Sequence, residues 1–348
     1  MKASIPPWVS RHQRGIGLVE IMVALTLGLV LMGGVLQVFL SNKQTYCMQE
    51  AHAHLQENGR FAMEKISRDI REAGYWGCAS RSVSASLKTT LNTLGTYQDY
   101  FYDFTRIVEG FESTGSSTWS PGIDTNVFLN ARGGNDILTV RAPLGSNIRI
   151  TAPMASSSDD PSISANNELT QNDIVMVSDC ASAIIMQVTD PSPQTAGPLQ
   201  HTTGSGSTPG NSTTDLEVVY GNDAEVVEIG TVSYYIRNNN YSGLPSLYQR
   251  EGSNNAEELI EGVENMQILY GEDTNGDFSA NRYLPANSVG DWANVVSVRL
   301  SLVLMTVEDN LTSSPQTYQF NGAPITAPDR RLRRVFTSTI GIRNRLAN

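Results

Sequence analysis

The stretch that decides the fold is residues 14–40, which read RGIGLVEIMVALTLGLVLMGGVLQVFL. Between residues 16 and 40 only Glu20, Thr26 and Gln37 are clearly polar, and no lysine or arginine interrupts the run. A helix needs about 20 apolar residues to cross the hydrocarbon core of a bilayer, so this run is long enough to span it. Glu20 is the unusual residue, because an ionised group inside such a segment is costly and usually has a function.

Positive charge lies on the N-terminal side of this run, at Lys2, Arg11 and Arg14. By the positive-inside rule, residues 1–15 stay in the cytoplasm and the chain beyond residue 41 is exported. A common secretory signal peptide fits less well, because its apolar region is shorter and has no internal acid. An ordinary signal anchor with a stray glutamate is the remaining alternative.

The same residues resemble the class III signal peptide of type IV pilins and of type II secretion pseudopilins. In that family a short basic leader ends in glycine, prepilin peptidase cuts after it, and glutamate is the fifth mature residue. Gly15, Ile16 and Glu20 occupy these positions here. The departure is Ile16, where the family most often has phenylalanine. The resemblance implies cleavage between Gly15 and Ile16 and N-methylation of the new amine.

Glu20 has a physical role in this scheme. In an assembled fibre, the buried amine of one subunit and the Glu20 carboxylate of its neighbour neutralise each other, whereas each is costly alone. This pairing favours subunits that are staggered in register. The alternative is a protonated Glu20 without a partner, since burial readily raises the pKa of an acid.

The amphipathic pattern continues beyond the apolar run. Apolar residues recur at helical spacing on one face, and Gly74 follows as a natural end of the helix. These positions are Met48, Ala51, Leu55, Ala62, Ile66, Ile70 and Ala73. We therefore expect a leader at 1–15, a transmembrane half-helix at 16–40, a periplasmic amphipathic helix at 41–74 and a β-rich head at 75–348.

The head shows short strand patterns separated by polar loops. No firm element is predicted for residues 79–135, and residues 156–167 and 191–214 read as mobile surface loops. Residues 256–270 read as a helix or loop that runs into a strand. The predicted strands are 137–141, 174–178, 183–188, 216–220, 224–229, 232–237, 295–307 and 334–343.

Two segments of the head carry a second resemblance. Residues 259–267 (LIEGVENMQ) with Tyr270, and 335–339 (VFTST) with 342–344 (IRN), are similar to the head of PilW-type minor pilins. The J-type minor pseudopilins share a similar pattern. The resemblance implies an α+β, type IV pilin-like fold, in which a long N-terminal helix packs on a β-rich globular head.

The three cysteines suit an oxidising compartment with one disulfide and one spare thiol. If one helix continues toward Cys78, Cys47 lies up to about 46 Å from it along the axis, which is too far for a bridge. Cys180 belongs to the distal body, which makes its pairing with Cys47 awkward. We therefore expect a Cys78–Cys180 disulfide.

The charge pattern constrains the partners. A net charge of −11 argues against a general nucleic-acid binder, and no specific nucleic acid is predicted. Arginines crowd the C-terminal end of the chain. We favour the interpretation that they lie on a solvated edge strand and prevent it from pairing with another chain. The alternative is a docking patch for an acidic neighbour. These arginines are Arg330, Arg331, Arg333, Arg334, Arg343 and Arg345.

Motifs for metal binding or catalysis fail on inspection. Asp273, Asn275 and Asp277 begin like a calcium loop, but the sixth and twelfth positions hold Phe278 and Leu284 instead of glycine and glutamate. A tight Asn-Gly turn is favoured, and we assign neither a metal nor a cofactor. The histidines lack metal-ligand spacing, and no nucleophile elbow, phosphate loop or Cys-x-x-Cys is present, so no enzyme activity is predicted.

The resemblance implies a minor pilin that joins other minor pilins in a priming complex at the tip and so starts pilus assembly. Its expected partners are other minor pilins, the major pilin, prepilin peptidase, a tip adhesin and inner-membrane lipid. We expect it in the inner membrane with its head in the periplasm, and in the extracellular pilus after assembly. The alternatives are a minor pseudopilin of type II secretion and, from another class, a membrane-anchored enzyme or receptor.

Overall fold

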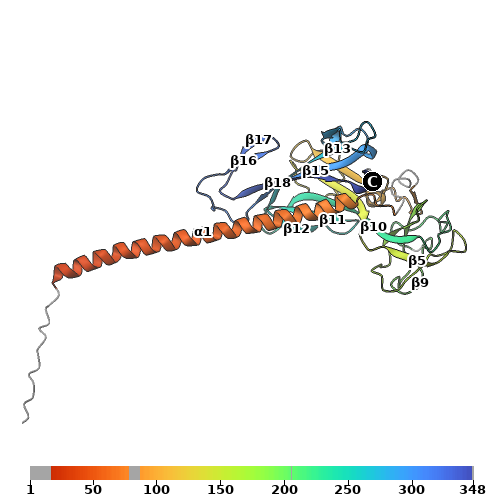
Figure 1. Ribbon diagram of the computed structural model, residues 1–348, viewed down its shortest axis with the longest axis horizontal. Helices are drawn as coiled ribbons and strands as arrows, with labels where there is room; N and C mark the ends of the chain where they lie inside the picture. Colours follow the sequence, from red (N-terminus) through yellow and green to blue (C-terminus); the bar gives the residue numbers. More distant parts are fainter. Residues whose placement is uncertain (1–16, 78–86, 205, 347–348) are drawn as a thin grey trace, which may run out of the picture. The chain divides into compact units, whose positions relative to one another are not determined.

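The computed structural model describes residues 17–77, 87–204 and 206–346. It divides into two compact units, Met1–Ala53 and His54–Asn348. Helix α1 (Leu18–Glu72) begins in the first unit and ends in the second (Figure 1). Each unit is described by itself below.

The first unit contains the apolar part of α1. Its large side chains from Leu18 to Leu40 are exposed, and this part of the helix is long and apolar enough to cross a membrane, with a mean hydropathy of 2.3. The hydroxyl of Thr26 donates to the carbonyls of Met22 and Val23, so this polar group is satisfied within the helix. Lipid can therefore cover the surface of this segment without leaving the hydroxyl unpaired.

The end of α1 lies in the second unit, close to the predicted position. Gly74 adopts a φ of +68°, a left-handed conformation that glycine takes without strain. Its amide donates to the carbonyl of Arg141 at 2.9 Å, which joins the chain after the helix to the head. The predicted first residue of the helix, Ile16, lies outside the described residues.

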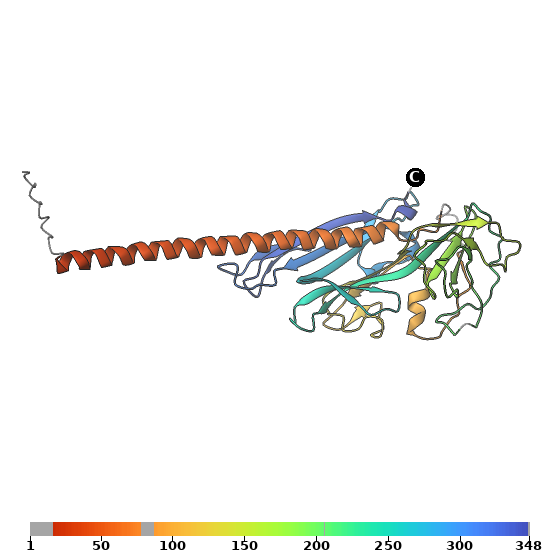
Figure 2. The same ribbon diagram turned by 90° about the horizontal axis from the view of Figure 1, so that it is seen from below.

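The last turns of α1 pack on a four-stranded antiparallel sheet in the order β14 (Arg282–Leu284), β13 (Val263–Glu272), β15 (Val295–Met305), β18 (Arg333–Gly341). Leu55, Ala62 and Ile66 are buried on the inner face of the helix. A Cβ atom on Gly59 would lie 2.2 Å from the ring of Phe336, so this glycine permits close contact with β18. Figures 1 and 2 both show this part of the helix lying along β18.

A larger, twelve-stranded sheet forms the rest of the head. Its strands are β1 (Lys88–Thr89), β2 (Val108–Ser113), β3 (Trp119–Ser120), β4 (Ile137–Pro143), β5 (Ile148–Ala152), β6 (Ser162–Ile163), β7 (Ile174–Ser178), β8 (Ala183–Gln187), β9 (Gly197–Pro198), β10 (Glu225–Asn238), β11 (Pro245–Glu251) and β12 (Glu257–Glu261). A separate hairpin joins β16 (Thr317–Phe320) and β17 (Ala323–Thr326). Short 3-10 helices lie at Tyr97–Tyr102, Ala286–Ser288, Trp292–Asn294 and Arg343–Arg345.

Strand β10 is paired on both of its edges. Its first residues pair with β5 and β7, and its later residues pair with β4 and β11. Residues 144–224, between β4 and β10, contain the strands β5 to β9 of this sheet, and together with the start of β10 they enclose an apolar core. A second core, rich in aromatic side chains, packs on β2, β4, β10 and β11, and in it Phe128 contacts Phe111 and Tyr235.

Most of the predicted strands are present. Residues 137–141, 174–178, 183–188, 295–307 and 334–343 correspond to β4, β7, β8, β15 and β18. Residues 224–229 and 232–237, predicted as separate strands, form the single strand β10. Residues 79–135, where no element was predicted, contain β1, β2, β3 and a 3-10 helix in their described part.

Two predictions are wrong. Residues 216–220 are not a strand: Glu217 has a φ of +62°, and the amide of Leu216 bonds to the Ser157 carbonyl outside any ladder. The side chains of Leu216 and Tyr220 are buried in a core, which explains their apolar character without a strand. At the start of residues 256–270 the predicted helix or loop is strand β12 instead, whereas the strand predicted after it is present as β13; Gly262 at a φ of +84° separates the two.

A buried hydrogen bond joins α1 to β10. The hydroxyl of Tyr234 donates to the Asp69 carboxylate, and Lys65 Nζ lies 3.3 Å from the same oxygen. Tyr234 is fully buried and Asp69 is 8% exposed. A carboxylate in such a place is stabilised only while its partners are present.

We predict that Tyr234→Phe destabilises the head. The change removes a hydrogen bond to a buried charged group and should cost about 1 to 3 kcal/mol. The measurement is thermal unfolding of the full chain in a non-ionic detergent. Tyr241→Phe is the matched control, because Tyr241 is 100% exposed. Equal melting temperatures for the two variants would contradict the role of this bond.

The side chain of His201 joins two polar loops, residues 156–167 and 191–214. Its fully buried ring places Nδ1 2.8 Å from Asp160 Oδ1 and Nε2 2.9 Å from the carbonyl of Thr214. Both neighbouring oxygens accept hydrogen bonds. The doubly protonated ring fits this place best, because only this form donates from both nitrogens. Burial lowers the pKa of His201, but the bonds to Asp160 and Thr214 outweigh it, so the pKa is raised above 6.5.

We predict that this raised pKa makes the stability of the head depend on pH. A group whose pKa is higher in the folded state stabilises fully below its unfolded pKa and loses that contribution as pH rises through the folded pKa. Melting temperature should therefore fall as the pH rises above 6.5. A His201→Gln variant should show a flatter profile, and an unchanged slope in that variant would contradict the assignment.

Candidate functional site

The apolar helix carries the first predicted site residue. Glu20 lies in the first turn of α1, is exposed, and donates its backbone amide to the Gly17 carbonyl at 2.9 Å. The predicted processing residues Gly15 and Ile16 lie outside the described residues. The geometry of cleavage is therefore not part of the described structure.

Glu20 is an isolated ionisable group. It is the only one between residues 17 and 42, and no described residue forms an ion pair or a side-chain hydrogen bond with it. In hydrocarbon its carboxylate must be neutralised by a proton or by a positive group of another molecule. The site is therefore suited to pairing with a positive group of another molecule.

The cysteines are only partly described. Cys47 carries a free thiol, and Cys180 is disulfide-bonded. Cys78 lies outside the described residues, so the Cys78–Cys180 pairing remains a prediction.

The acidic loop at residues 273–277 is held by its own backbone. The Asp273 carboxylate accepts hydrogen bonds from the amides of Asn275, Gly276 and Phe278. These bonds lower the pKa of Asp273 against the opposing effect of desolvation. Asn275 and Asp277 bond to each other, which is the arrangement of a tight turn.

The C-terminal arginines do not form one patch. Strand β18 is an edge strand, and Arg330, Arg334 and Arg343 are exposed, but the interpretation of these arginines as solvated is wrong for Arg331, Arg333 and Arg345. Arg333 is 5% exposed and forms ion pairs with Glu264 and Asp329, with contacts of 2.6 Å to each. Arg331 and Arg345 donate to backbone carbonyls of the head. Burial lowers the pKa of Arg345 to about 10.

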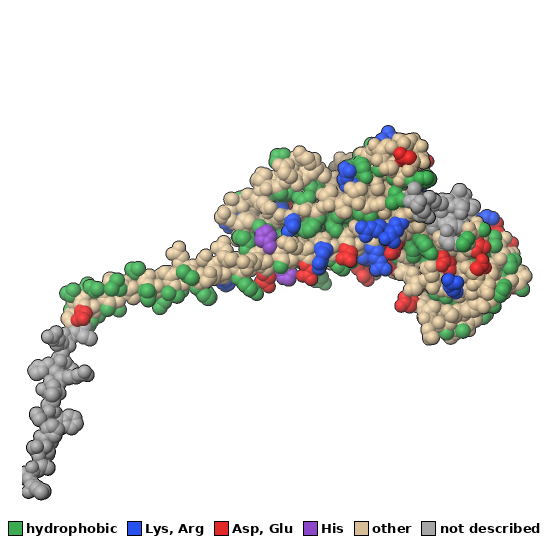
Figure 3. Space-filling view, viewed as in Figure 1, with side chains coloured by type: hydrophobic (Ala, Val, Ile, Leu, Met, Phe, Trp, Pro, Cys, Tyr) green, Lys and Arg blue, Asp and Glu red, His purple; other side chains and the backbone are tan. Residues whose placement is uncertain are grey.

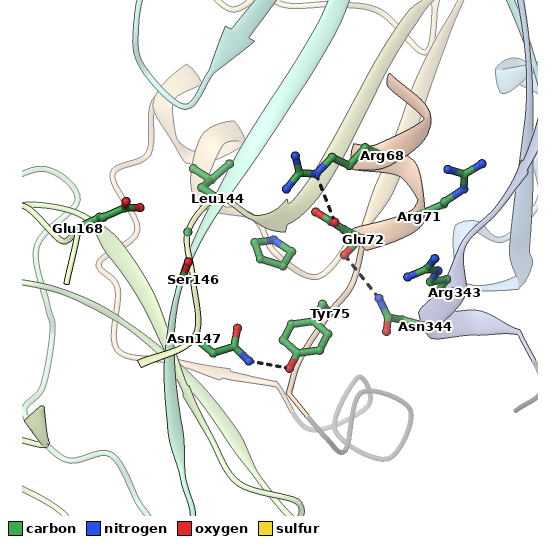
Figure 4. A pocket seen from close by; sticks show the side chains of 12 residues that line it. Arg68, Arg71, Glu72, Tyr75, Leu144, Ser146, Asn147, Glu168, Arg343 and Asn344 are labelled. Atoms are coloured by element: carbon green, nitrogen blue, oxygen red, sulfur yellow. Dashed lines mark hydrogen bonds and ion pairs between the residues drawn. The ribbon is translucent and has the colours of Figure 1, made fainter. Parts of the chain in front are cut away.

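Arg343 is placed differently, at a hollow beside the C-terminal end of α1. This cavity of about 380 Å³ lies between the helix end, the segment after β4 and the C-terminal 3-10 helix. Arg68 and Arg71 reach it from α1, and Figure 4 shows the guanidinium groups of all three arginines around it. In Figure 3 a large group of positive side chains is visible on this face of the second unit.

The walls of this hollow are fixed by hydrogen bonds. Asn344 donates to the Ala73 carbonyl at 3.0 Å and so satisfies the last turn of the helix. On the opposite side, Asn147 donates to the Tyr75 hydroxyl (Figure 4). Its amide also donates to Glu225. Burial, and then the Glu225 carboxylate, raise the pKa of Tyr75, so it stays protonated at neutral pH.

Sequence reasoning singled out Arg343 only as a member of the C-terminal cluster, and it missed Arg68 and Arg71. The three residues come from α1 and from the far end of the chain, so no local spacing connects them. A basic residue in the last turn of a helix is also common, because the helix dipole favours it. Only the fold brings these residues to one hollow.

Two family models match parts of the chain. Residues 233–344 match the Type IV Pilus-assembly protein W family, PilW, and residues 10–36 match the prokaryotic N-terminal methylation motif. Among solved structures, the chain is similar to a type IV-like pilin from Thermus thermophilus, with 10% identity, coverage of 84% of this chain and 97% of that chain, and a TM-score of 0.29. No curated protein matches the chain.

Proposed function

We propose that this chain is a type IV pilin of the PilW type and a minor subunit of a type IV pilus, supported by the matches of its N-terminus to the methylation motif and of residues 233–344 to the PilW family. The single observation that carries this proposal is the lone Glu20 carboxylate on an exposed apolar helix whose N-terminal residues match the methylation motif. Pilins are structural, non-enzymatic proteins, and we extend this to the present chain.

The proposal assigns a task to each part of the chain. Residues 1–15 are the cytoplasmic leader, 16–40 span the inner membrane, 41–74 form the periplasmic helix and 75–348 form the head. Prepilin peptidase cuts between Gly15 and Ile16 and methylates the new amine. After assembly the subunit lies in the extracellular pilus.

Glu20 then directs entry into the fibre. The amine of an incoming Ile16 pairs with the Glu20 carboxylate of a neighbour, and each charge neutralises the other in low dielectric. Removal of one partner of a buried ion pair costs about 3 to 5 kcal/mol, which is enough to exclude a subunit from the fibre.

The proposed partners are other pilins. This chain joins further minor pilins in a complex that primes the fibre and then remains at its tip, where a tip adhesin and the major pilin adjoin it. The name of the matching family favours pilus assembly over type II secretion.

We predict that the mature chain begins at Ile16. Cleavage after the small Gly15 removes the basic leader, and methylation adds about 14 Da to the new N-terminus. Intact mass measurement of the membrane form gives the result directly. A chain that retains Met1, or that begins at another residue, would contradict the processing site.

We predict that Glu20→Ala leaves the chain in the membrane but largely excludes it from pili. Insertion should survive, because alanine costs less than glutamate in lipid. Incorporation should fall, because the Ile16 amine loses its partner. The measurement is the amount of this protein in sheared fibres and in membranes, with pilus number per cell.

Gln37→Ala is the matched control, because it removes a polar but uncharged side chain from the same apolar run. It should enter fibres at the unmutated level. Equal incorporation of Glu20→Ala and Gln37→Ala would refute the pairing mechanism. Loss of Glu20→Ala from the membrane itself would show a folding role instead.

A further inference from the structure

Most positive side chains of the described residues have a partner within the chain. Arg141 is fully buried beside Glu109, Arg250 donates to the Val127 carbonyl, and Arg299 lies over the ring of Tyr283. The described lysines and arginines without a hydrogen bond, ion pair or ring contact are Lys43, Arg60, Arg71, Arg149 and Arg343.

Three of these unmatched cations line adjoining hollows of the second unit. Arg71 and Arg343 line the hollow at the end of α1, and Arg149 lines a neighbouring cavity of about 460 Å³. The two hollows share the residues 145–147 and Glu168. We call them together the arginine groove, which also includes Arg68.

The guanidinium groups of the groove do not converge on one point. Figure 4 shows those of Arg68, Arg71 and Arg343 turned in different directions around the hollow. Arg149 lines the adjoining cavity but not the hollow at the end of α1. A single small anion contacts one or two such groups, whereas an extended ligand with several negative charges contacts all of them.

The rest of the groove suits a peptide more than an apolar ligand. Ser146, Asn147 and Asn166 contribute hydroxyl and amide groups, which bond to peptide N–H and C=O groups. Three carboxylates also line the two hollows: Glu72, which is paired with Arg68, Glu168 and Glu228. Glu228 is half-buried, and burial followed by the nearby Asp173 and Glu251 raises its pKa to about 7. Its negative charge is therefore reduced near neutral pH.

We propose that the arginine groove binds an acidic peptide segment of a neighbouring pilin subunit. Carboxylates of that segment pair with Arg71, Arg343 and Arg149, while Ser146 and Asn147 bind its backbone. The proposal rests on the proposed function, because it is the fibre that brings a neighbouring subunit to this face. The acidic character of the whole chain, with a net charge of −11, disfavours nucleic acid as the occupant.

The first test measures binding of a short fluorescent peptide of glutamate and serine to the full chain in a non-ionic detergent. The matching peptide of glutamine and serine is the neutral probe. The glutamate peptide should bind, and binding should weaken with salt. The triple variant Arg71→Gln/Arg149→Gln/Arg343→Gln should bind about tenfold more weakly, since each exposed pair contributes modestly.

Arg60→Gln is the matched control, because Arg60 is also an unmatched, exposed arginine of α1 but does not line the groove. Its affinity for the glutamate peptide should equal that of the unmutated chain. Melting temperatures of all variants show whether the head is intact. Equal binding of the glutamate and glutamine peptides, or unchanged affinity of an intact triple variant, would overturn the proposal.

Inorganic phosphate is the competitor that distinguishes a peptide site from a simple anion site. Phosphate should displace the glutamate peptide only at concentrations where sodium chloride of equal ionic strength also does. Displacement at much lower phosphate concentration would show that the groove holds a compact anion, and the peptide assignment would fail.

The second test separates this inference from the proposed function. Sheared fibres are compared from cells with the unmutated chain, Arg71→Glu/Arg343→Glu and Arg60→Glu. Absence of the unmutated chain from fibres would refute the minor-pilin proposal itself. Its presence, with loss of only the groove variant, supports the docking role. Equal incorporation of all three would overturn the groove while leaving the pilin assignment intact.

Discussion

The hydrogen-bond ladder on both edges of β10 is the constraint on which the rest of the head depends. One strand of 14 residues pairs with β5 and β7 near its start and with β4 and β11 near its end. Its side chains contribute to both apolar cores, and Tyr234 also binds the helix through Asp69. A change in its register would move side chains between faces in both halves of the sheet at once.

Those parts of the fold that depend on local pattern could be predicted from the sequence. The apolar run and the amphipathic pattern that follows it predicted α1, and Gly74 predicted its end. These signals are local and need no tertiary contact. Strand β7 was readable as a short apolar run and β15 as a long strand. The prediction of a strand at 216–220 failed because buried apolar residues such as Leu216 produce the sequence pattern of a strand. The backbone at Glu217 instead has a positive φ, which is not a strand conformation. Residues 256–261 looked helical, but pairing with β11 decides their conformation.

The candidate sites show the same division. Glu20 was readable because a charge in an apolar run stands out without any structure. The arginine groove was not, because Arg71, Arg149 and Arg343 come from a helix, a strand and the chain end. The PilW-like segment that includes Asn344 has a structural meaning here, since this side chain satisfies the last carbonyls of α1. The matched family region thus contributes directly to holding the helix end.

The excursion of residues 144–224 has a topological consequence. Because Pro143 pairs with Ile229, the chain leaves β4 and reaches the later part of β10 at adjacent points. The segment between them carries β5 to β9 of the same sheet around a core of its own. From Ile229 onward the ladder is independent of how many residues the detour contains. We therefore expect that this segment can differ in length and surface, while the neighbouring strands that match the PilW family keep their pairing.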